Sequence, residues 1–289
     1  MDGKGAPAGA APDTPGGEPA TRAPDAGGGE AVELRDMLSA ALLADDPTGP
    51  LLQLLASGWA ERIAPELPAL ELEQDPIHRH KDVLAHTVAV TAKTRPDLRL
   101  RLAALFHDIG KPATRSFKGG KVSFHQHEAV GAKITRRRLR ALGYPEDVVA
   151  DVTELVRLSG RFKGFSGGWS DAAVRRYARD AGHLLGQLNE LVRCDCTTRN
   201  RARAEELQHH VDELEERIKQ LAEEERRAAE RPLLDGHAVM QHLGLGPGPE
   251  IGEALRFLLG LRRDRPDLTA TETLHRLDQW WEERGDPAD

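Results

Sequence analysis

The stretch LAALFHDIGK, residues 102–111, decides the fold, because its apolar run ends in two adjacent ionisable residues, His107 and Asp108. The Gly110-Lys111-Pro112 that follows is typical of a helix end. His107 follows apolar residues at spacings of three, four and seven, so it lies on the apolar face of a helix predicted over 98–109. An unpaired buried carboxylate costs several kcal/mol. The fold must therefore give Asp108 a compensating partner.

The composition of the 289-residue chain limits the classes of protein to which it can belong. A net charge of -7 argues against a protein that mainly coats nucleic acid, although local basic patches are compatible with it. No apolar run approaches the roughly 20 residues of a membrane span, and the N-terminus lacks the pattern of a secretory signal. Cys194 and Cys196 flank a single residue and are poor candidates for a disulfide. We therefore expect a cytoplasmic protein without membrane contact.

The chain divides by composition into four parts. Residues 1–30 are mostly Gly, Ala and Pro, with no apolar side chain larger than Ala apart from Met1, so we expect a disordered tail. Helical spacing of apolar residues begins at residue 31. We expect a helical neck over 31–74, a central domain over 75–200 and a C-terminal helical body over 201–289.

Apolar periodicity predicts an all-α fold, with no alternation of strands and helices. The predicted helices include residues 51–63, 98–109, 127–142, 146–158, 171–181, 184–197 and 202–231. Ser170 is the expected N-cap of one of them, and one short hairpin is allowed around Gly119-Gly120. The helix over 202–231 carries a short apolar seam on a charged surface. This favours packing on its own domain over a dimerising coiled coil.

Three predicted helices each place a metal-capable side chain on an apolar face. Besides His107 with its neighbour Asp108, His86 shares a face with two valines, and Asp195 follows apolar residues at spacings of three, four and seven. A single inward His is more often a hydrogen-bonded core residue, and a single buried Asp usually pairs with Arg. Four such groups on three helices favour a shared divalent cation, which would neutralise the carboxylates and use imidazoles as neutral ligands.

The order His86, His107-Asp108, Asp195 resembles the metal-binding signature of the HD-domain phosphohydrolase superfamily. Around it, DPIHRHKDVLAHT, LAALFHDIGKPATR, VSFHQHEAVGAK, WSDAAVRRYARDAG and LVRCDCTTRN resemble the HD and body region of actinobacterial CCA-adding tRNA nucleotidyltransferases. The resemblance runs from about residue 31 to 281 and is most specific over 75–200. It implies an HD-domain helical bundle in which these four residues are the metal ligands.

Two departures from that family bear on function. Its catalytic head needs a strand-rich fold and an Asp-x-Asp pair, and no Asp-x-Asp occurs in this sequence, so we expect no nucleotide addition by this chain alone. The segment LVRLSGRFKGF carries Ser159 and Lys163 where the family resemblance leads one to expect histidines. In the binuclear members of the HD superfamily, histidines of this region help hold a second metal, so the resemblance implies that these substitutions favour one metal, although His127 is retained.

A site with two histidines and two aspartates leaves coordination positions open. This suits manganese, iron, cobalt, nickel or magnesium better than a closed structural zinc. An open site activates water and polarises a phosphoryl oxygen. Asp108 is expected to ligate with one oxygen and to orient that water with the other. Lys111, His127 and Lys163 are candidates for binding substrate phosphate, and the alternative for each lysine is a solvated surface residue.

Two functions follow as hypotheses. The first is a metal-dependent phosphohydrolase acting on a phosphorylated nucleotide or nucleoside, either a monoester or a cyclic diester. The second is the tRNA-binding body module of a split or truncated CCA-adding nucleotidyltransferase, suggested by basic clusters at residues 135–140, 174–179 and 198–203. These clusters are equally compatible with ordinary helix surface.

Overall fold

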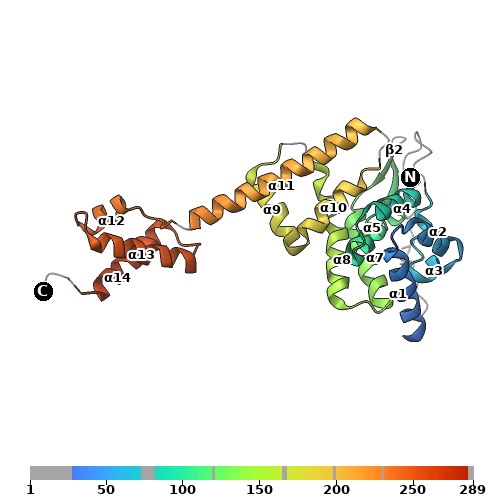
Figure 1. Ribbon diagram of the computed structural model, residues 1–289, viewed down its shortest axis with the longest axis horizontal. Coiled ribbons are helices and arrows are strands. Elements are labelled where there is room, and N and C mark those ends of the chain that lie inside the picture. The colour runs from blue at the N-terminus through green and yellow to red at the C-terminus, as the bar shows by residue number, and fades with distance from the viewer. Residues whose placement is uncertain are drawn as a thin grey trace, which may run out of the picture.

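The described residues form helices and one two-stranded hairpin, which confirms the predicted all-α class (Figure 1). The computed structural model describes residues 28–72, 82–118, 121–164, 168–197, 200–229 and 231–285. The first part of the chain contains α1 (Gly28–Leu43), α2 (Thr48–Ala56), α3 (Trp59–Ile63) and the short 3-10 helix η1 (Pro68–Leu70).

The neck region differs from its prediction at two points. α1 begins at Gly28, so residues 28–30 are helical and the predicted tail through residue 30 was wrong there; residues 1–27 lie outside the described residues. The apolar run predicted as one helix over 51–63 forms the two helices α2 and α3. Gly58 separates them with a φ of 80°, a left-handed conformation that glycine adopts without steric cost.

The central elements carry the residues of the predicted metal site. They are α4 (Val83–Lys93), α5 (Leu98–Phe106), α6 (Lys111–Thr114), β1 (Arg115–Lys118), β2 (Lys121–Phe124), α7 (His127–Ala141), α8 (Glu146–Leu158), η2 (Arg161–Gly164), α9 (Asp171–Ala181), η3 (Gly182–Leu184) and α10 (Leu185–Asp195). The bounds of α8 and α9 agree with those predicted, and Ser170 caps α9 by accepting a hydrogen bond from the amide of Ala173. The hairpin lies where it was predicted.

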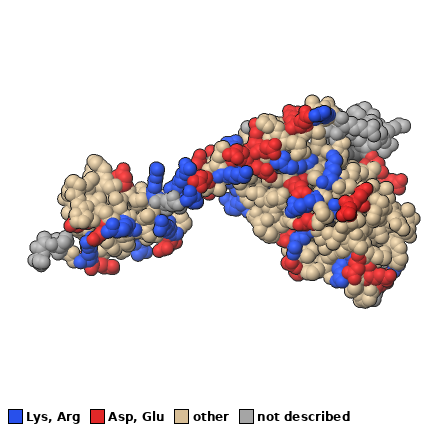
Figure 2. All heavy atoms as spheres, viewed as in Figure 1, with Lys and Arg blue, Asp and Glu red and all other residues tan. Residues whose placement is uncertain are grey.

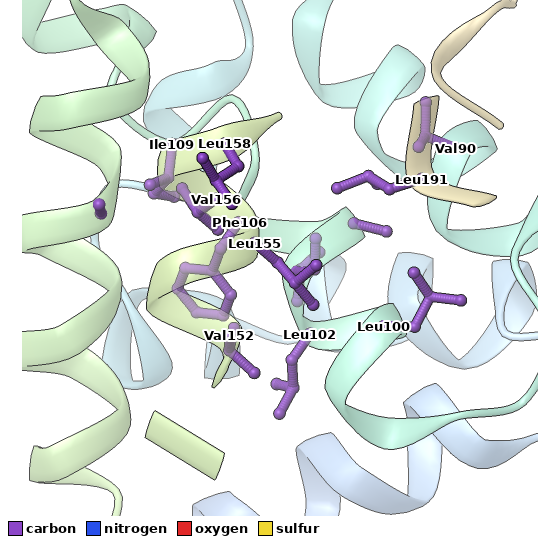
Figure 3. Close-up of a cluster of buried hydrophobic side chains, with 14 of the residues drawn as sticks. Val90, Leu100, Leu102, Phe106, Ile109, Val152, Leu155, Val156, Leu158 and Leu191 are labelled. Carbon is purple, nitrogen blue, oxygen red and sulfur yellow. The ribbon is translucent and has the colours of Figure 1, made fainter. Parts of the chain in front are cut away.

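α5 is the central helix of the main core. Asp97 caps its N-terminus by accepting a hydrogen bond from the amide of Leu100, and α4 and α8 pack against it. Figure 3 shows Leu102 and Phe106 of this helix among apolar side chains of α8, with Leu191 of α10 nearby. Every residue from Leu100 to Phe106 is buried, so the turn that follows α5 begins in the interior.

One of the two arginines of α5 is buried in the core. The side chain of Arg101 is buried and donates hydrogen bonds to the carbonyl oxygens of Thr94, Leu42 and Ala44. The guanidinium group thereby satisfies main-chain acceptors near the end of α1 and after α4. It ties the neck helices to the core, a role that apolar periodicity alone did not indicate.

The C-terminal part consists of α11 (Arg201–Ala229), α12 (Gly236–Leu243), α13 (Pro249–Asp264) and α14 (Ala270–Glu283). The apolar seam of α11 packs on the main core, with Val211, Leu214 and Leu221 buried, as the short seam suggested. The last three helices enclose a second, smaller core that includes Val239 and Leu258. Figure 1 shows them grouped at the far end of α11.

Two further expectations concern membranes and cysteines. Among the described residues, no helix combines the length and the apolar character that crossing a bilayer requires. Cys194 and Cys196 are both free thiols, in agreement with their predicted unsuitability for a disulfide.

An ion pair between the neck and α7 predicts how acid destabilises the protein. Glu66 accepts hydrogen bonds from Arg138 at 2.7 and 2.9 Å, and the Arg138 side chain is only 3% exposed. Burial alone would raise the pKa of Glu66, but the hydrogen bonds and charge of Arg138 outweigh it and lower this pKa. The pair therefore stabilises the fold above about pH 4.5, and this contribution disappears as the pH falls.

We expect Glu66→Gln to lower the free energy of unfolding by about 2 kcal/mol at pH 7, because a buried guanidinium loses its counter-charge. The difference from the wild type should shrink on acidification below about pH 4.5. Urea unfolding at several pH values measures it. Glu154→Gln is the control, because Glu154 pairs with the exposed Arg157 one turn away on the same helix. Equal effects of both substitutions at all pH values would contradict this account.

Candidate metal centre

The centre is built on the turn that follows α5. The helix ends at Phe106, three residues before the predicted end, so His107 is its C-cap and Asp108 lies in the turn leading to α6. The amide of Lys111 donates to the carbonyl oxygen of Asp108 and closes the turn. His107 and Asp108 are both buried, as their apolar context predicted, although neither belongs to the helix itself.

A glycine allows this turn to pack directly on α7. A Cβ atom added to Gly110 would lie 2.2 Å from the carbonyl oxygen of His127 and 2.7 Å from the amide nitrogen of Gly131. No larger residue fits without moving one backbone away from the other. Gly110 therefore brings Asp108 to the start of α7, where His127 lies.

Side chains from four parts of the chain meet at this turn. One ligand atom from each of His86, His107 and Asp108 lies within 4.8 Å of the others. Asp195 places Oδ1 2.9 Å from Nε2 of His86 and 3.4 Å from Nε2 of His107. On the other side, Nε2 of His127 lies 3.5 Å from Oδ1 of Asp108. The structure thus brings the four predicted ligands together, with His127 beside them.

Main-chain carbonyls fix the orientation of two of the imidazoles. Nδ1 of His107 lies 2.7 Å from the carbonyl oxygen of Ala104, and Nδ1 of His127 lies 2.8 Å from that of Phe124. A carbonyl oxygen only accepts, so each Nδ1 carries the proton and each Nε2 faces Asp108. Such contacts on the far nitrogen are typical of metal-binding histidines.

The third imidazole is held by a side chain that the sequence reasoning missed. Nδ1 of His86 lies 2.9 Å from the hydroxyl of Thr197, which follows Asp195 by two residues. A hydroxyl both donates and accepts, so this contact positions the ring without fixing its tautomer. The proximity of Thr197 to Asp195 in the sequence was the only available signal for this role.

Without a bound cation, the charged groups of the centre shift each other's pKa values in opposite directions. Burial alone would raise the pKa of Asp108, but His107, His127 and Lys111 lower it well below its usual range. Burial likewise would lower the pKa of His107, but the two carboxylates raise it to about 10. A proton on His107 thus balances part of the charge of Asp108 and Asp195 in the metal-free protein.

The proton on Nε2 of His107 lies close to both carboxylates but is not well aligned with either. Nε2 of His107 is buried and makes no hydrogen bond of acceptable geometry with the described residues, although Oδ2 of Asp108 lies 3.2 Å away. An unsatisfied buried polar atom facing two carboxylates is the arrangement expected when a metal ion completes the site. The nitrogen and oxygen donors suit a divalent cation.

The remaining predicted site residues have different outcomes. Lys111 is buried, and its Nζ lies 2.7 Å from Oδ2 of Asp108, so the alternative of a solvated surface lysine was wrong. The side chain of Lys163 lies outside the described residues, and its role stays a prediction. Ser159 donates to the carbonyl oxygen of Val156 at the end of α8. Glu128, which the sequence reasoning missed, places Oε2 3.3 Å from Nδ1 of His127.

The centre opens toward the surface on one side. The Asp195 side chain is 35% exposed and that of His86 15%, whereas that of Asp108 is only 4% exposed. His86 and Asp195 are therefore the more exposed members of the centre, and Asp108 is its most deeply buried carboxylate. Such a graded exposure is compatible with open coordination positions for small molecules.

Comparison with known proteins assigns a family to this centre. Residues 60–181 match the HD domain family. The chain contains an HD domain. The match includes His86, His107 and Asp108, whereas Asp195 lies beyond its C-terminal limit. The limits of the predicted central domain, 75–200, stay a prediction.

Several curated relatives resemble the HD domain together with the helices that follow it. The chain is 35% identical over 258 residues to the A-adding tRNA nucleotidyltransferase of Deinococcus radiodurans, covering 86% of this chain and 58% of that protein. It is 35% identical over 242 residues to the CC-adding tRNA nucleotidyltransferase of Thermus thermophilus, covering 78% of this chain and 51% of that protein. The chain thus spans about half the length of these relatives.

Metal binding to the HD domain should become tighter as the pH rises. A cation competes with the proton on His107, whose pKa is about 10 in the metal-free protein. We expect the apparent association constant for Mn²⁺, measured by calorimetry, to rise about tenfold per pH unit from about pH 6 to 8. His107→Gln should lower the affinity by about 100-fold or more.

His209→Gln is the matched control, because His209 is exposed on α11 and its Nε2 lies 3.2 Å from Glu213, which is not one of the proposed ligands. It should bind Mn²⁺ as the wild type does. An affinity that does not change with pH, or that His107→Gln leaves intact, would contradict this assignment of the centre.

Proposed function

We propose that the protein is a metal-dependent phosphohydrolase acting on a nucleotide-like phosphate ester, either a monoester or a cyclic diester. The supporting observation is the convergence of imidazole Nε2 atoms on the buried Asp108, with Nδ1 of His107 and His127 held by main-chain carbonyls. The HD domain match is compatible with this class of chemistry. The free thiols suit the reducing cytoplasm, where we place the protein.

His86, His107, Asp108 and Asp195 are the residues that would hold a divalent ion, with Mn²⁺, Co²⁺, Ni²⁺, Fe²⁺ or Mg²⁺ as candidates. Such an ion supplies Lewis acidity toward a phosphoryl oxygen and makes water a stronger nucleophile at neutral pH. The donor set of two imidazoles and two carboxylates leaves positions open for substrate, unlike a closed structural site.

Each remaining residue has a role that follows from its contacts. The low pKa of Asp108 makes it a poor base, so its Oδ1 orients the attacking water by accepting a hydrogen bond. Nε2 of His127 lies beside that oxygen, where it would donate a hydrogen bond to Asp108 or to the phosphate of a bound substrate. The ammonium group of Lys111 is close enough to Asp108 to neutralise charge on the bound phosphate.

Phosphate release from a panel of nucleotides tests this function. In the presence of Mn²⁺, Co²⁺, Ni²⁺ or Mg²⁺, the purified protein should hydrolyse at least one member of the panel. His107→Ala and Asp108→Ala should each lower kcat by at least about 1,000-fold, because the ion that activates water is lost. His209→Ala should leave the rate unchanged. Activity that persists in both site variants would show that another protein or another site is responsible.

A second candidate function is tRNA binding, favoured by one observation. The similarity to tRNA nucleotidyltransferases covers 86% of the chain and therefore extends past the HD match into the C-terminal helices. Against it, Arg137 and Arg138 of the basic cluster at 135–140 pair with Glu66, and Arg140 pairs with Glu146. Figure 2 likewise shows basic side chains interspersed with acidic ones on the visible face.

Salt dependence distinguishes true tRNA binding from weak charge attraction. If the protein binds tRNA, raising the salt concentration from about 50 to about 200 mM should weaken the affinity measured by fluorescence anisotropy. We expect a loss of about tenfold for every two phosphates that the protein contacts. A DNA duplex of similar charge should bind more weakly at each salt concentration. Undetectable tRNA binding at about 50 mM salt would remove this candidate.

A further inference from the structure

The β1–β2 hairpin is joined to the metal centre at both of its ends. α6 leads from the Asp108 turn directly into β1, and β2 ends at Phe124, whose carbonyl oxygen accepts the hydrogen bond from Nδ1 of His127. Lys111 at the start of α6 contacts Asp108. The hairpin stands at the edge of the helical bundle (Figure 1). Its position next to the centre is therefore set by two of the centre's own residues.

The strand register places two aromatic rings and a guanidinium group on one face. Arg115 pairs with Phe124 and Phe117 pairs with Val122, so these four residues share one face of the hairpin, here called the hairpin face. The other face carries Ser116 and Ser123, whose hydroxyls form a hydrogen bond of 2.7 Å. The two faces thus differ in chemistry.

Cations and rings alternate along the hairpin face, starting from the metal centre. Nζ of Lys111 lies 5.6 Å from the ring centroid of Phe124. Next to Phe124 across the strands is Arg115, whose guanidinium carbon lies 4.8 Å from the ring centroid of Phe117. This row connects the buried Asp108 with a ring at the surface.

Phe117 is the terminal member of the row and is 68% exposed. A single exposed apolar residue is common on protein surfaces and needs no explanation by itself. Here, however, the exposed ring continues a row of cations and rings that begins at the candidate phosphate-binding lysine. Arg115 covers part of the ring and leaves the rest accessible to solvent.

We infer that the hairpin face binds the nucleobase of a substrate whose phosphate lies at the metal centre, with the base stacked on Phe117. This inference rests on the proposed phosphohydrolase function and adds to it the residue that would contact the base of a nucleotide-like substrate. Every base has a π-face, so stacking on Phe117 tolerates different bases, and the cationic groups along the row attract the negative backbone.

Substitution of Phe117 tests the stacking contact. Because the ring is exposed, Phe117→Ala is compatible with folding, and Phe117→Trp keeps an aromatic surface. The probes are nucleoside monophosphates, a short single-stranded oligonucleotide with a terminal phosphate, and ribose phosphate, which lacks a base. Leu52→Ala is the control, because Leu52 is another exposed large apolar residue, 52% exposed and located on α2.

With the metal-loaded protein, Phe117→Ala should raise KM about tenfold for base-bearing substrates, leave kcat unchanged, and leave ribose phosphate hydrolysis unaffected. Phe117→Trp and Leu52→Ala should retain the wild-type KM. An effect on the oligonucleotide alone identifies nucleic-acid ends as the source of the base, whereas an effect on both identifies mononucleotides as well. Unchanged KM for all base-bearing probes, or an equal loss on ribose phosphate, overturns the inference.

Binding separates this inference from the proposed hydrolysis. Anisotropy of a labelled single-stranded oligonucleotide reports the stacking contact without turnover. If no phosphate is released but Phe117→Ala weakens binding about tenfold, the inference about the hairpin face is supported and the proposed hydrolase function is contradicted. If phosphate is released and Phe117→Ala changes neither KM nor binding, the proposed hydrolase function is supported and the inference about the hairpin face is contradicted.

Discussion

The burial of the Asp108 carboxylate is the constraint on which the rest of this structure depends. Its side chain is 4% exposed, and burying an unpaired charge there would cost several kcal/mol, which is a large fraction of the net stability of a typical domain. Lys111 and the imidazoles of His107 and His127 surround it, and a proton on His107 balances the charge when no cation is bound. A divalent ion in place of that proton would neutralise more of the charge of the two carboxylates.

The fold supplies each partner of Asp108 from a separate element. The apolar helix α5 carries the turn into the interior, and Gly110 lets that turn touch the backbone of α7. α4 and α10 bring His86 and Asp195 to the centre, where both side chains are more exposed than that of Asp108. The β1–β2 hairpin continues from the same turn and extends the polar centre toward the surface. The centre and the hairpin face therefore both adjoin the turn that follows α5.

Sequence patterns predicted the parts of this arrangement that depend on periodicity. The bounds of α8 and α9 and the burial of His107 and Asp108 follow from apolar spacing and capping. The early end of α5 was missed, because the turn keeps an apolar residue, Ile109, in register with the helix. The burial of Lys111 depends on the packing of α6 and α7, and the pairing of Arg138 with Glu66 joins segments far apart in the chain. Tertiary contacts of this kind leave no local signal.

The most direct measurement of the central claim is a crystal structure of the protein soaked with Mn²⁺, with diffraction recorded at the manganese absorption edge. The account predicts an anomalous peak about 2.0–2.4 Å from Nε2 of His86 and His107 and from the carboxylates of Asp108 and Asp195. A peak elsewhere on the protein, or none at saturating Mn²⁺, would contradict it.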